Sequence, residues 1–193
     1  MVVMNPIQTQ KKDIRNRLLG QRDLIPHLMK MTYDQRICHF LWELMERMGH
    51  QTVHTYLPMG SEIDIFPFIG KCLQHKKTII APQTLPGRRF NNLELTSLQD
   101  VELGIFGTMH PAGNRVFEGS YDLIVLPGLA CDAEKYRVGY GGGYYDTFLA
   151  DWPEAHKVGV FYPFQQIEKV PREPHDMPLD DLLIGRDGSI VFS

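Results

Sequence analysis

The chain reads Asp122-Leu123-Ile124-Val125-Leu126-Pro127 and then Arg137-Val138-Gly139-Tyr140-Gly141-Gly142-Gly143-Tyr144-Tyr145-Asp146, and these two segments decide the fold. The first predicts a buried strand at 122–126, because a run of aliphatic residues ends at a Pro-Gly pair. The glycines predict a tight loop, and residues 143–151 predict a helix. A strand, a glycine loop and a helix N-terminus favour phosphate binding, since free amides and the helix dipole point at the anion.

The glycine loop differs from two common phosphate-binding motifs. It lacks the Gly-Lys-Ser/Thr ending of a Walker A motif, and its glycines do not have the G-x-G-x-x-G spacing of dinucleotide-binding proteins. A flexible surface loop is the ordinary alternative for an isolated glycine run. Arg137, the Tyr144-Tyr145 pair and Asp146 favour a ligand site instead, because a linker would more typically carry Ser, Asn or Lys.

The rest of the chain alternates helices and strands. We expect helices at 7–23, 33–48 (with a capping box of Thr32 and Gln35), 64–75 and 143–151; strands at 52–57, 78–81, 93–98, 122–126, 157–162, 182–184 and 189–192; a loop at 85–92; and irregular chain at 104–113. This order predicts an α/β fold: one three-layer domain spanning residues 1–193, with a mainly parallel sheet and helices on both faces.

Ligands of such sheets bind beyond the carboxyl ends of the strands. We therefore expect the turns after Leu57, Ala81, Leu126 and Tyr162 to converge on one crevice. This arrangement also predicts that Glu62 lies close to the glycine loop.

Composition narrows the class of protein. The chain has 193 residues, of which 43% are hydrophobic and 22% charged, as in ordinary soluble globular proteins. A net charge of −3 argues against a general nucleic-acid binder, and no apolar run approaches the ~20 residues of a membrane span. The N-terminal MVVMNPIQTQKK lacks the apolar core of a signal peptide, and the three cysteines indicate inert thiols in a reducing cytosol. We expect a cytoplasmic monomer that acts on small molecules, although the sequence leaves the oligomeric state open.

The glycine segment resembles the signature of the 5-formyltetrahydrofolate cyclo-ligases, or methenyltetrahydrofolate synthetases, which typically read R-L-G-x-G-x-G-Y-Y-D. Further segments resemble the family in the same order: Lys11-Lys12-Asp13-Ile14-Arg15, Tyr56-Leu57-Pro58-Met59-Gly60-Ser61-Glu62-Ile63-Asp64, and Pro174-His175-Asp176 through Asp180. Val138 replaces a commoner leucine, Tyr140 stands where many members carry a basic residue, and Thr147 replaces a frequent arginine. The resemblance spans nearly the whole chain and implies a fold similar to that of sugar-phosphate isomerases and coenzyme A transferases.

The resemblance implies ATP- and Mg²⁺-dependent conversion of 5-formyltetrahydrofolate to 5,10-methenyltetrahydrofolate, with release of ADP and phosphate. The γ-phosphoryl group is expected to move to the formyl oxygen, after which N10 attacks the activated carbon. Two alternatives remain: a protein that binds formylfolate without turnover, and an isomerase on the same scaffold. RNA binding through the Tyr/Gly run is disfavoured by the acidic net charge.

The resemblance also implies roles for particular residues. Arg137 and Tyr144 would be catalytic, the first through its fork of donors to phosphate and the second by orienting the formyl group. The nucleotide would be held by Lys11, Lys12, Arg15, Arg137, Val138, Gly139, Tyr140, Gly141, Gly142, Gly143, Tyr144 and Tyr145. The folate would be held by Leu57, Met59, Glu62 and Tyr144, and Mg²⁺ by Asp146 and Asp180, with Asp181 as the alternative to Asp180.

Each assignment has an ordinary structural alternative. Asp146 and Glu62 could each cap a nearby helix, and Lys11 with Arg15 could face solvent. Asp180 and Asp181 could be turn residues, and His175 could make a structural hydrogen bond.

Overall fold

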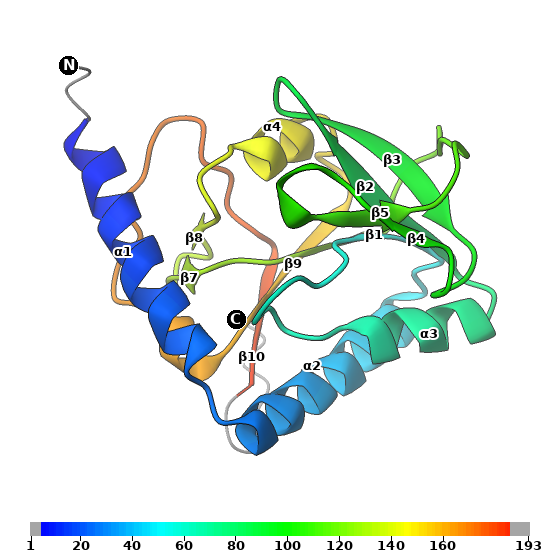
Figure 1. Ribbon diagram of the computed structural model, residues 1–193, viewed down its shortest axis with the longest axis horizontal. Coiled ribbons are helices and arrows are strands. Elements are labelled where there is room, and N and C mark those ends of the chain that lie inside the picture. Colours follow the sequence, from blue (N-terminus) through cyan, green and yellow to red (C-terminus); the bar gives the residue numbers. More distant parts are fainter. Residues whose placement is uncertain (1–4, 186–193) are drawn as a thin grey trace.

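A computed structural model of the protein describes residues 5–185, and its centre is a six-stranded sheet of order β10-β9-β6-β1-β2-β3 (Figure 1). The strands are β1 (Thr52–Thr55), β2 (Thr78–Leu85), β3 (Arg89–Leu95), β6 (Leu123–Leu126), β9 (His156–Phe161) and β10 (Asp181–Ile184). The β1–β2, β1–β6, β6–β9 and β9–β10 pairs are parallel, and the β2–β3 pair is antiparallel. The predicted mainly parallel sheet is confirmed.

The protein has the helices α1 (Pro6–Asp23), α2 (His27–Met48), α3 (Phe66–Gln74) and α4 (Tyr144–Ala150). Helices α2 and α3 cover one face of the sheet and α4 covers the other. The aliphatic run of β6 serves both faces, because successive side chains of a strand point to opposite sides. Leu123 and Val125 join the core under α2 and α3, whereas Ile124 and Leu126 join the core under α4.

Helix α1 stands beside the sheet and packs on a short hairpin, β7 (Ala130–Cys131) and β8 (Arg137–Val138) (Figure 1). Asn5 caps the helix by accepting a hydrogen bond from the Ile7 N–H at 3.1 Å. Leu18 is fully buried in a small cluster with Ala130 and Val138. The helix is therefore held against the chain that leads into the glycine loop.

Several predicted boundaries need correction. Helix α2 begins at His27, not at 33, and Thr32 is no cap: its hydroxyl donates to the Leu28 carbonyl one turn earlier. Residues 27–32 contain good helix formers and no glycine, so the helix continues back to Pro26. The segment expected to be irregular contains the hairpin of β4 (Val101–Leu103) and β5 (Met109–Pro111), with a 3-10 turn at Ile105–Gly107. The strand expected at 189–192 lies outside the described residues.

The loop expected at 85–92 is a β-hairpin. Strand β2 runs to Leu85 and pairs with Arg89 at the start of β3. Pro82 does not end β2, because β1 pairs with β2 only as far as Ile80 and the missing N–H therefore leaves no ladder bond unmade on that side. Gly87 (φ 79°) and Arg88 (φ 59°) both adopt left-handed conformations and reverse the chain.

No helix within residues 5–185 combines the length and the apolar character that a membrane crossing requires.

Candidate active site

A cavity of about 880 Å³ opens at the carboxyl ends of the strands. Leu57 and Pro127 reach it from the turns after β1 and β6, and Pro82 reaches it from β2. The turn after Tyr162 does not line it; Gln165 of that turn lines a separate cavity of about 10 Å³ instead. The predicted turns after Leu57 and Leu126 therefore converge, whereas the chain after Ala81 reaches the cavity as part of β2 and not as a turn. Glu62 does meet the glycine loop in one cavity.

The glycine loop, residues 139–143, forms one wall of the large cavity. Gly141 (φ 99°) and Gly143 (φ 69°) adopt left-handed conformations that favour glycine. Arg15 donates from Nε to the Gly139 carbonyl at 2.8 Å. A Cβ at Gly141 would lie 3.1 Å from Arg15 Cζ, so glycine permits the guanidinium to approach the loop.

Arg137 and Asp146, at opposite ends of the loop, form an ion pair of 2.9 Å. The Arg137 side chain is only 3% exposed, yet its Nε has no hydrogen-bond partner within the described part of the chain. A buried donor without a partner is costly unless a ligand meets it. Within residues 5–185, the Asp146 carboxylate accepts its hydrogen bond from Arg137 and not from a backbone N–H of α4, whose N-cap residue is Gly143.

Lys11 is buried and faces the cavity, not solvent. Its ammonium contacts both oxygens of Asp176, at 2.6 and 2.8 Å, and Glu173 at 3.1 Å. Lys12 is exposed at the rim of the same cavity. Asp176, Glu173 and His175 also bring carboxylate and imidazole atoms within 4.8 Å of one another, a donor set suited to a cation.

The structure does not bring Asp180 to the cavity, which corrects the predicted Asp146–Asp180 metal pair. Asp180 lies before β10, at the amino ends of the strands, where its carboxylate accepts the Lys157 N–H at 2.7 Å. Its neighbour Asp181 accepts from His156 Nε2 at 2.9 Å. Asp176, four residues earlier in the chain, lines the cavity together with Asp146.

Glu62 is buried in the lining of the cavity, with 4% of its surface exposed. Its Oε2 accepts the Met59 N–H at 2.9 Å, whereas Oε1 has no hydrogen-bond partner among the described residues. Burial raises the pKa of this carboxyl, and the Met59 N–H, Arg22 and Tyr140 oppose that rise. The hydrogen bond from the Met59 N–H to Glu62 lies within a turn before α3. Glu62 therefore does not cap α3, whose N-cap residue is Ile65.

The two tyrosines after the glycines have different surroundings. Tyr144 donates its hydroxyl to the Leu85 carbonyl at 2.9 Å and stacks on Phe90 at 5.4 Å between ring centroids. Tyr145 faces the Arg137 guanidinium, which lies 5.7 Å from its ring centroid, and burial raises its pKa. Tyr144 thus ties the loop to the β2–β3 hairpin.

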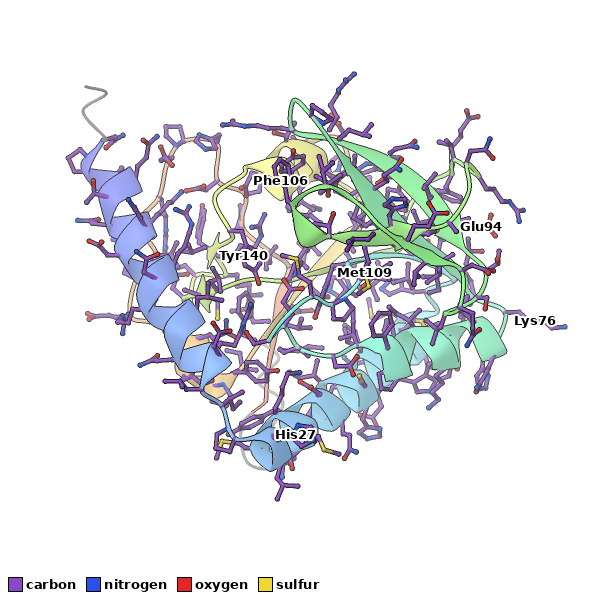
Figure 2. The ribbon with its side chains drawn as sticks, in the orientation of Figure 1. His27, Lys76, Glu94, Phe106, Met109 and Tyr140 are labelled. Atoms are coloured by element: carbon purple, nitrogen blue, oxygen red, sulfur yellow. The ribbon has the colours of Figure 1, made fainter. Side chains whose placement is uncertain are left out.

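Several residues that line the cavity were not singled out from the sequence, namely Gln8, Thr84, Arg88, Phe90, Phe106, Thr108, Met109 and Glu173. Arg88 is at the tip of the β2–β3 hairpin, where a Cβ built on Gly143 would lie 3.5 Å from its Cζ. Figure 2 shows Phe106 and Met109 of the β4–β5 region and Tyr140 of the loop around the space beside α1. Phe106 has a left-handed backbone (φ 58°) and is 77% exposed, a combination that no periodicity in the sequence reveals.

Fold and site together define an α/β protein with a glycine-rich loop in a cavity at the carboxyl ends of a mainly parallel sheet. Residues 7–185 match the profile of the 5-formyltetrahydrofolate cyclo-ligase family. The chain belongs to that family, as its sequence predicts. Members of the family are ligases, and this protein is therefore an enzyme of the ligase class.

Individual relatives agree. The 5-formyltetrahydrofolate cyclo-ligase of Haemophilus influenzae is 28% identical over 187 residues, which cover 93% of this chain and 100% of that protein. The enzyme of the same name from Escherichia coli K12 is 30% identical over 139 residues, covering 68% of this chain and 76% of that protein. The solved Aquifex aeolicus 5,10-methenyltetrahydrofolate synthetase superposes with a TM-score of 0.79 at 30% identity, covering 95% of this chain and 96% of that one.

Proposed function

We propose that this protein converts 5-formyltetrahydrofolate to 5,10-methenyltetrahydrofolate with ATP and Mg²⁺, releasing ADP and phosphate. The observation that supports this most is one cavity that joins the glycine loop to Glu62. Its volume, about 880 Å³, suits a site for two small molecules at the upper end of ordinary ligand pockets. Membership of the cyclo-ligase family supplies the reaction class.

The chemical difficulty of the reaction is a resonance-stabilised formamide with a poor leaving group. In the proposed path the formyl oxygen attacks the γ-phosphorus of ATP, and the bond to the ADP oxygen breaks. N10 then attacks the activated formyl carbon, phosphate leaves with the formyl oxygen, and N10 loses its proton. Each step asks the protein for positioning and charge neutralisation more than for covalent chemistry.

The cationic wall of the cavity fits the phosphates. The free Nε–H of Arg137 and the amides of the glycine loop are donors for phosphate oxygens. Arg15 braces the loop through the Gly139 carbonyl, and Lys11 adds a buried ammonium. These residues would hold the transferring group against the formyl oxygen.

The carboxylates of the cavity fit a magnesium ion. Asp146 and Asp176 both line it and offer the hard oxygen ligands that Mg²⁺ prefers. Bound there, the metal would neutralise phosphate charge as it develops.

Glu62 fits the pterin. The amidine-like edge of a pterin presents paired N–H donors, and Glu62 Oε1 is a buried acceptor without a partner in the part of the chain that the structure describes. Leu57 and Met59 line the same cavity and provide apolar surface. Tyr144 also lines this cavity, and its hydroxyl donates to the Leu85 carbonyl; we expect its ring to orient the formyl group.

The test is the ATP-dependent appearance of methenyltetrahydrofolate absorbance, with ADP measured in the same samples. We expect one ADP for each product molecule, and a Glu62→Gln variant about 100-fold lower in kcat/KM for the folate, because an amide presents N–H groups to the pterin's own donors. Folded protein without either signal contradicts the proposal. Tight formylfolate binding without ADP release supports a non-catalytic binder, and turnover that needs no ATP supports an isomerase.

A further inference from the structure

We propose that Tyr140 positions the Glu62 carboxylate and thereby couples the glycine loop to the folate end of the cavity. This inference rests on the proposed function and concerns a residue that stands where many family members carry a basic side chain. Tyr140 belongs to the loop by its backbone, between Gly139 and Gly141, but its side chain reaches the surroundings of Glu62.

The Tyr140 phenol is held by α1. Arg22 is buried, and its Nη2 donates to the Tyr140 hydroxyl while its Nε donates to Ser61 Oγ at 3.0 Å. The guanidinium also lies 5.6 Å from the centroid of the Tyr140 ring. Because the phenol accepts from Arg22, its own hydrogen remains available to a further acceptor.

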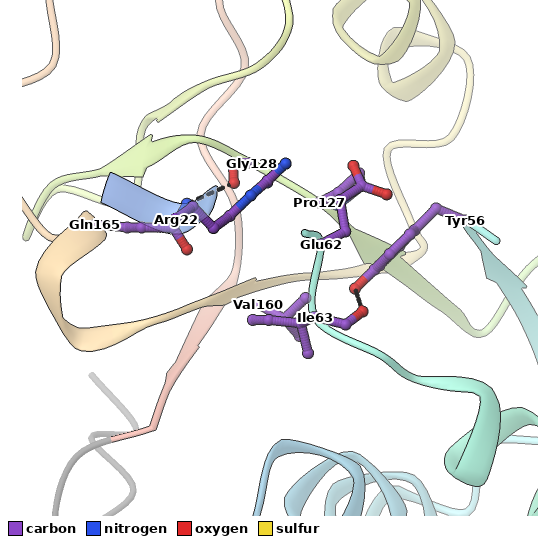
Figure 3. A pocket seen from close by; sticks show the side chains of 8 residues that line it. All are labelled: Arg22, Tyr56, Glu62, Ile63, Pro127, Gly128, Val160 and Gln165. Atoms are coloured by element: carbon purple, nitrogen blue, oxygen red, sulfur yellow. Dashed lines mark hydrogen bonds between the residues drawn. The ribbon is translucent and has the colours of Figure 1, made fainter. Parts of the chain in front are cut away.

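Glu62 fits as that acceptor, because it follows Ser61, the other hydrogen-bond partner of Arg22, and lines the large cavity together with Tyr140. In keeping with this geometry, the phenol lowers the pKa of the Glu62 carboxyl, and burial together with this carboxylate raises the pKa of the phenol. Glu62 Oε1 has no partner within residues 5–185. Figure 3 shows Arg22 and Glu62 coming from different elements to line the same small cavity, with Gly128 and Gln165 on the side of Arg22.

Few other charged or titratable groups face Glu62. Arg22 of α1 and Lys30 of α2 are the cations that act on its carboxyl, and Tyr56, Tyr140 and Tyr145 are the tyrosines coupled to it. Arg22 touches Tyr140 directly, so the phenol mediates between the nearest guanidinium and the carboxylate. Loss of the Tyr140 hydroxyl would remove the donor that is available to the buried Glu62 carboxylate.

The same helix also holds the backbone of the loop. Arg15, two turns before Arg22 on α1, donates to the Gly139 carbonyl, and its guanidinium packs on Gly141. Two arginines of one helix face thus bracket Tyr140, one through its backbone neighbours and the other through its hydroxyl. A ligand that orders the loop also orders the phenol, and with it the carboxylate that receives the pterin.

The decisive variant is Tyr140→Phe, which keeps the ring and removes the hydroxyl. We expect the KM for 5-formyltetrahydrofolate to rise about tenfold and the KM for ATP to change by less than about twofold. A non-hydrolysable ATP analogue with Mg²⁺ should tighten folate binding about fivefold or more in the unaltered protein, and by less than about twofold in the variant. The pH below which folate affinity falls should be higher in the variant, because one influence that lowers the Glu62 pKa is gone.

The matched control is Tyr136→Phe, the same change just before the loop and outside the cavity lining, which should alter none of these quantities. Arg22→Lys keeps the charge without the planar fork, and should raise the same KM by a smaller factor. Unchanged folate affinity and unchanged coupling in Tyr140→Phe would overturn the inference, as would equal losses for ATP and folate. These outcomes are separable from failure of the proposed function, which shows itself as no formylfolate binding by the unaltered protein.

Discussion

The two ends of the sheet carry the same kinds of charged side chains but use them differently. At the amino ends, Asp122 accepts the N–H groups of Gln51 and Thr52 at 2.7 and 2.9 Å, and Asp180 accepts the Lys157 N–H. Each of these carboxylates precedes one strand and is engaged by the start of the neighbouring strand, β1 for Asp122 and β9 for Asp180. At the carboxyl ends, Glu62 Oε1 and Arg137 Nε are buried without partners in the described chain.

The difference separates structural from functional polar groups. A carboxylate that completes the hydrogen bonding of a strand end stabilises the fold and has little left to offer a ligand. A buried group with an unmade hydrogen bond costs stability in the free protein, and its presence indicates a ligand that completes it. The predictions below set one end against the other.

The largest contrast is between the two buried cations Arg137 and Lys157. Arg137→Ala should lower turnover about 1000-fold, because donors to the transferring phosphate are lost, while the free energy of unfolding falls by less than about 2 kcal/mol. Lys157 donates to the carbonyls of Pro153 and Ala155 at 2.9 and 2.8 Å. Lys157→Met should leave turnover intact and cost about 2–3 kcal/mol of stability. Steady-state assays and urea titrations of both variants decide the point, and a collapse of stability in Arg137→Ala would make Arg137 a structural residue.

The second prediction concerns His54 in β1, between the two ends. Burial lowers its pKa from 6.5 to about 4, and its Nε2 is 3.0 Å from Asn92 Oδ1. The unfolded chain takes up a proton as the pH falls through about 6.5, whereas the folded protein does so only near 4. The free energy of unfolding that is present above pH 6.5 is therefore reduced by about 3 kcal/mol as the pH falls from about 6.5 to about 4.

The measurement is the free energy of unfolding from urea titrations between pH 7 and pH 4, for the unaltered protein and for His54→Gln. Glutamine retains a donor for Asn92 but does not titrate. The difference between the two proteins should shrink by about 3 kcal/mol on acidification. A constant difference would show that the imidazole is not the group responsible.

The third prediction compares two aspartates four positions apart. Asp176→Ala should raise the Mg²⁺ concentration for half-maximal activity about tenfold or more, because Asp176 lines the cavity. Asp180→Ala should leave that concentration unchanged and lower stability by about 1 kcal/mol, because the Lys157 N–H loses its acceptor. Magnesium titrations of turnover, with melting curves for both variants, provide the test; a magnesium effect in Asp180→Ala alone would reinstate the pairing of Asp146 with Asp180.

The smallest effect is expected at Arg88, whose φ of 59° is unfavourable for a side chain with a Cβ. Arg88→Gly should stabilise the hairpin by up to about 1 kcal/mol and raise the KM for ATP about threefold. A gain in stability together with a loss of affinity for ATP is the diagnostic result. A loss of both would indicate that the arginine side chain anchors the hairpin.

The sequence allowed much of the fold to be predicted, because it depends on local patterns. The aliphatic run at 123–126 and the Gly-to-Asp146 segment specify β6 and the loop before α4 almost to the residue. The β2–β3 hairpin was missed because two adjacent left-handed residues, of which one is an arginine, are set by pairing in the sheet and not by turn composition. The start of α2 was placed too late because Thr32 mimics a capping residue.

The candidate site was predictable where its residues are close to the glycine motif and less so elsewhere. Lys11 and Arg15 were identified through the motif that they share, and Arg22 lies seven residues after Arg15, outside that motif. Asp176 and Asp180 belong to one segment, and the sequence alone does not reveal that Asp180 is engaged beside the start of β10 whereas Asp176 lines the cavity. Phe106 comes from a hairpin far along the chain, and only the packing of β5 against β2 brings it to the cavity.

The ion pairs that line the cavity have a consequence for binding of the proposed nucleotide. Arg137 holds Asp146 and Lys11 holds Asp176, so each cation already has an anion beside it. Phosphates that displace these carboxylates would leave two negative charges without a cation, unless a divalent ion enters with the phosphates and binds the released carboxylate oxygens. We therefore expect the protein to bind the complex of ATP with its metal more tightly than ATP alone or the metal alone. Only the complex both supplies phosphates to the two cations and supplies a cation to the two released carboxylates.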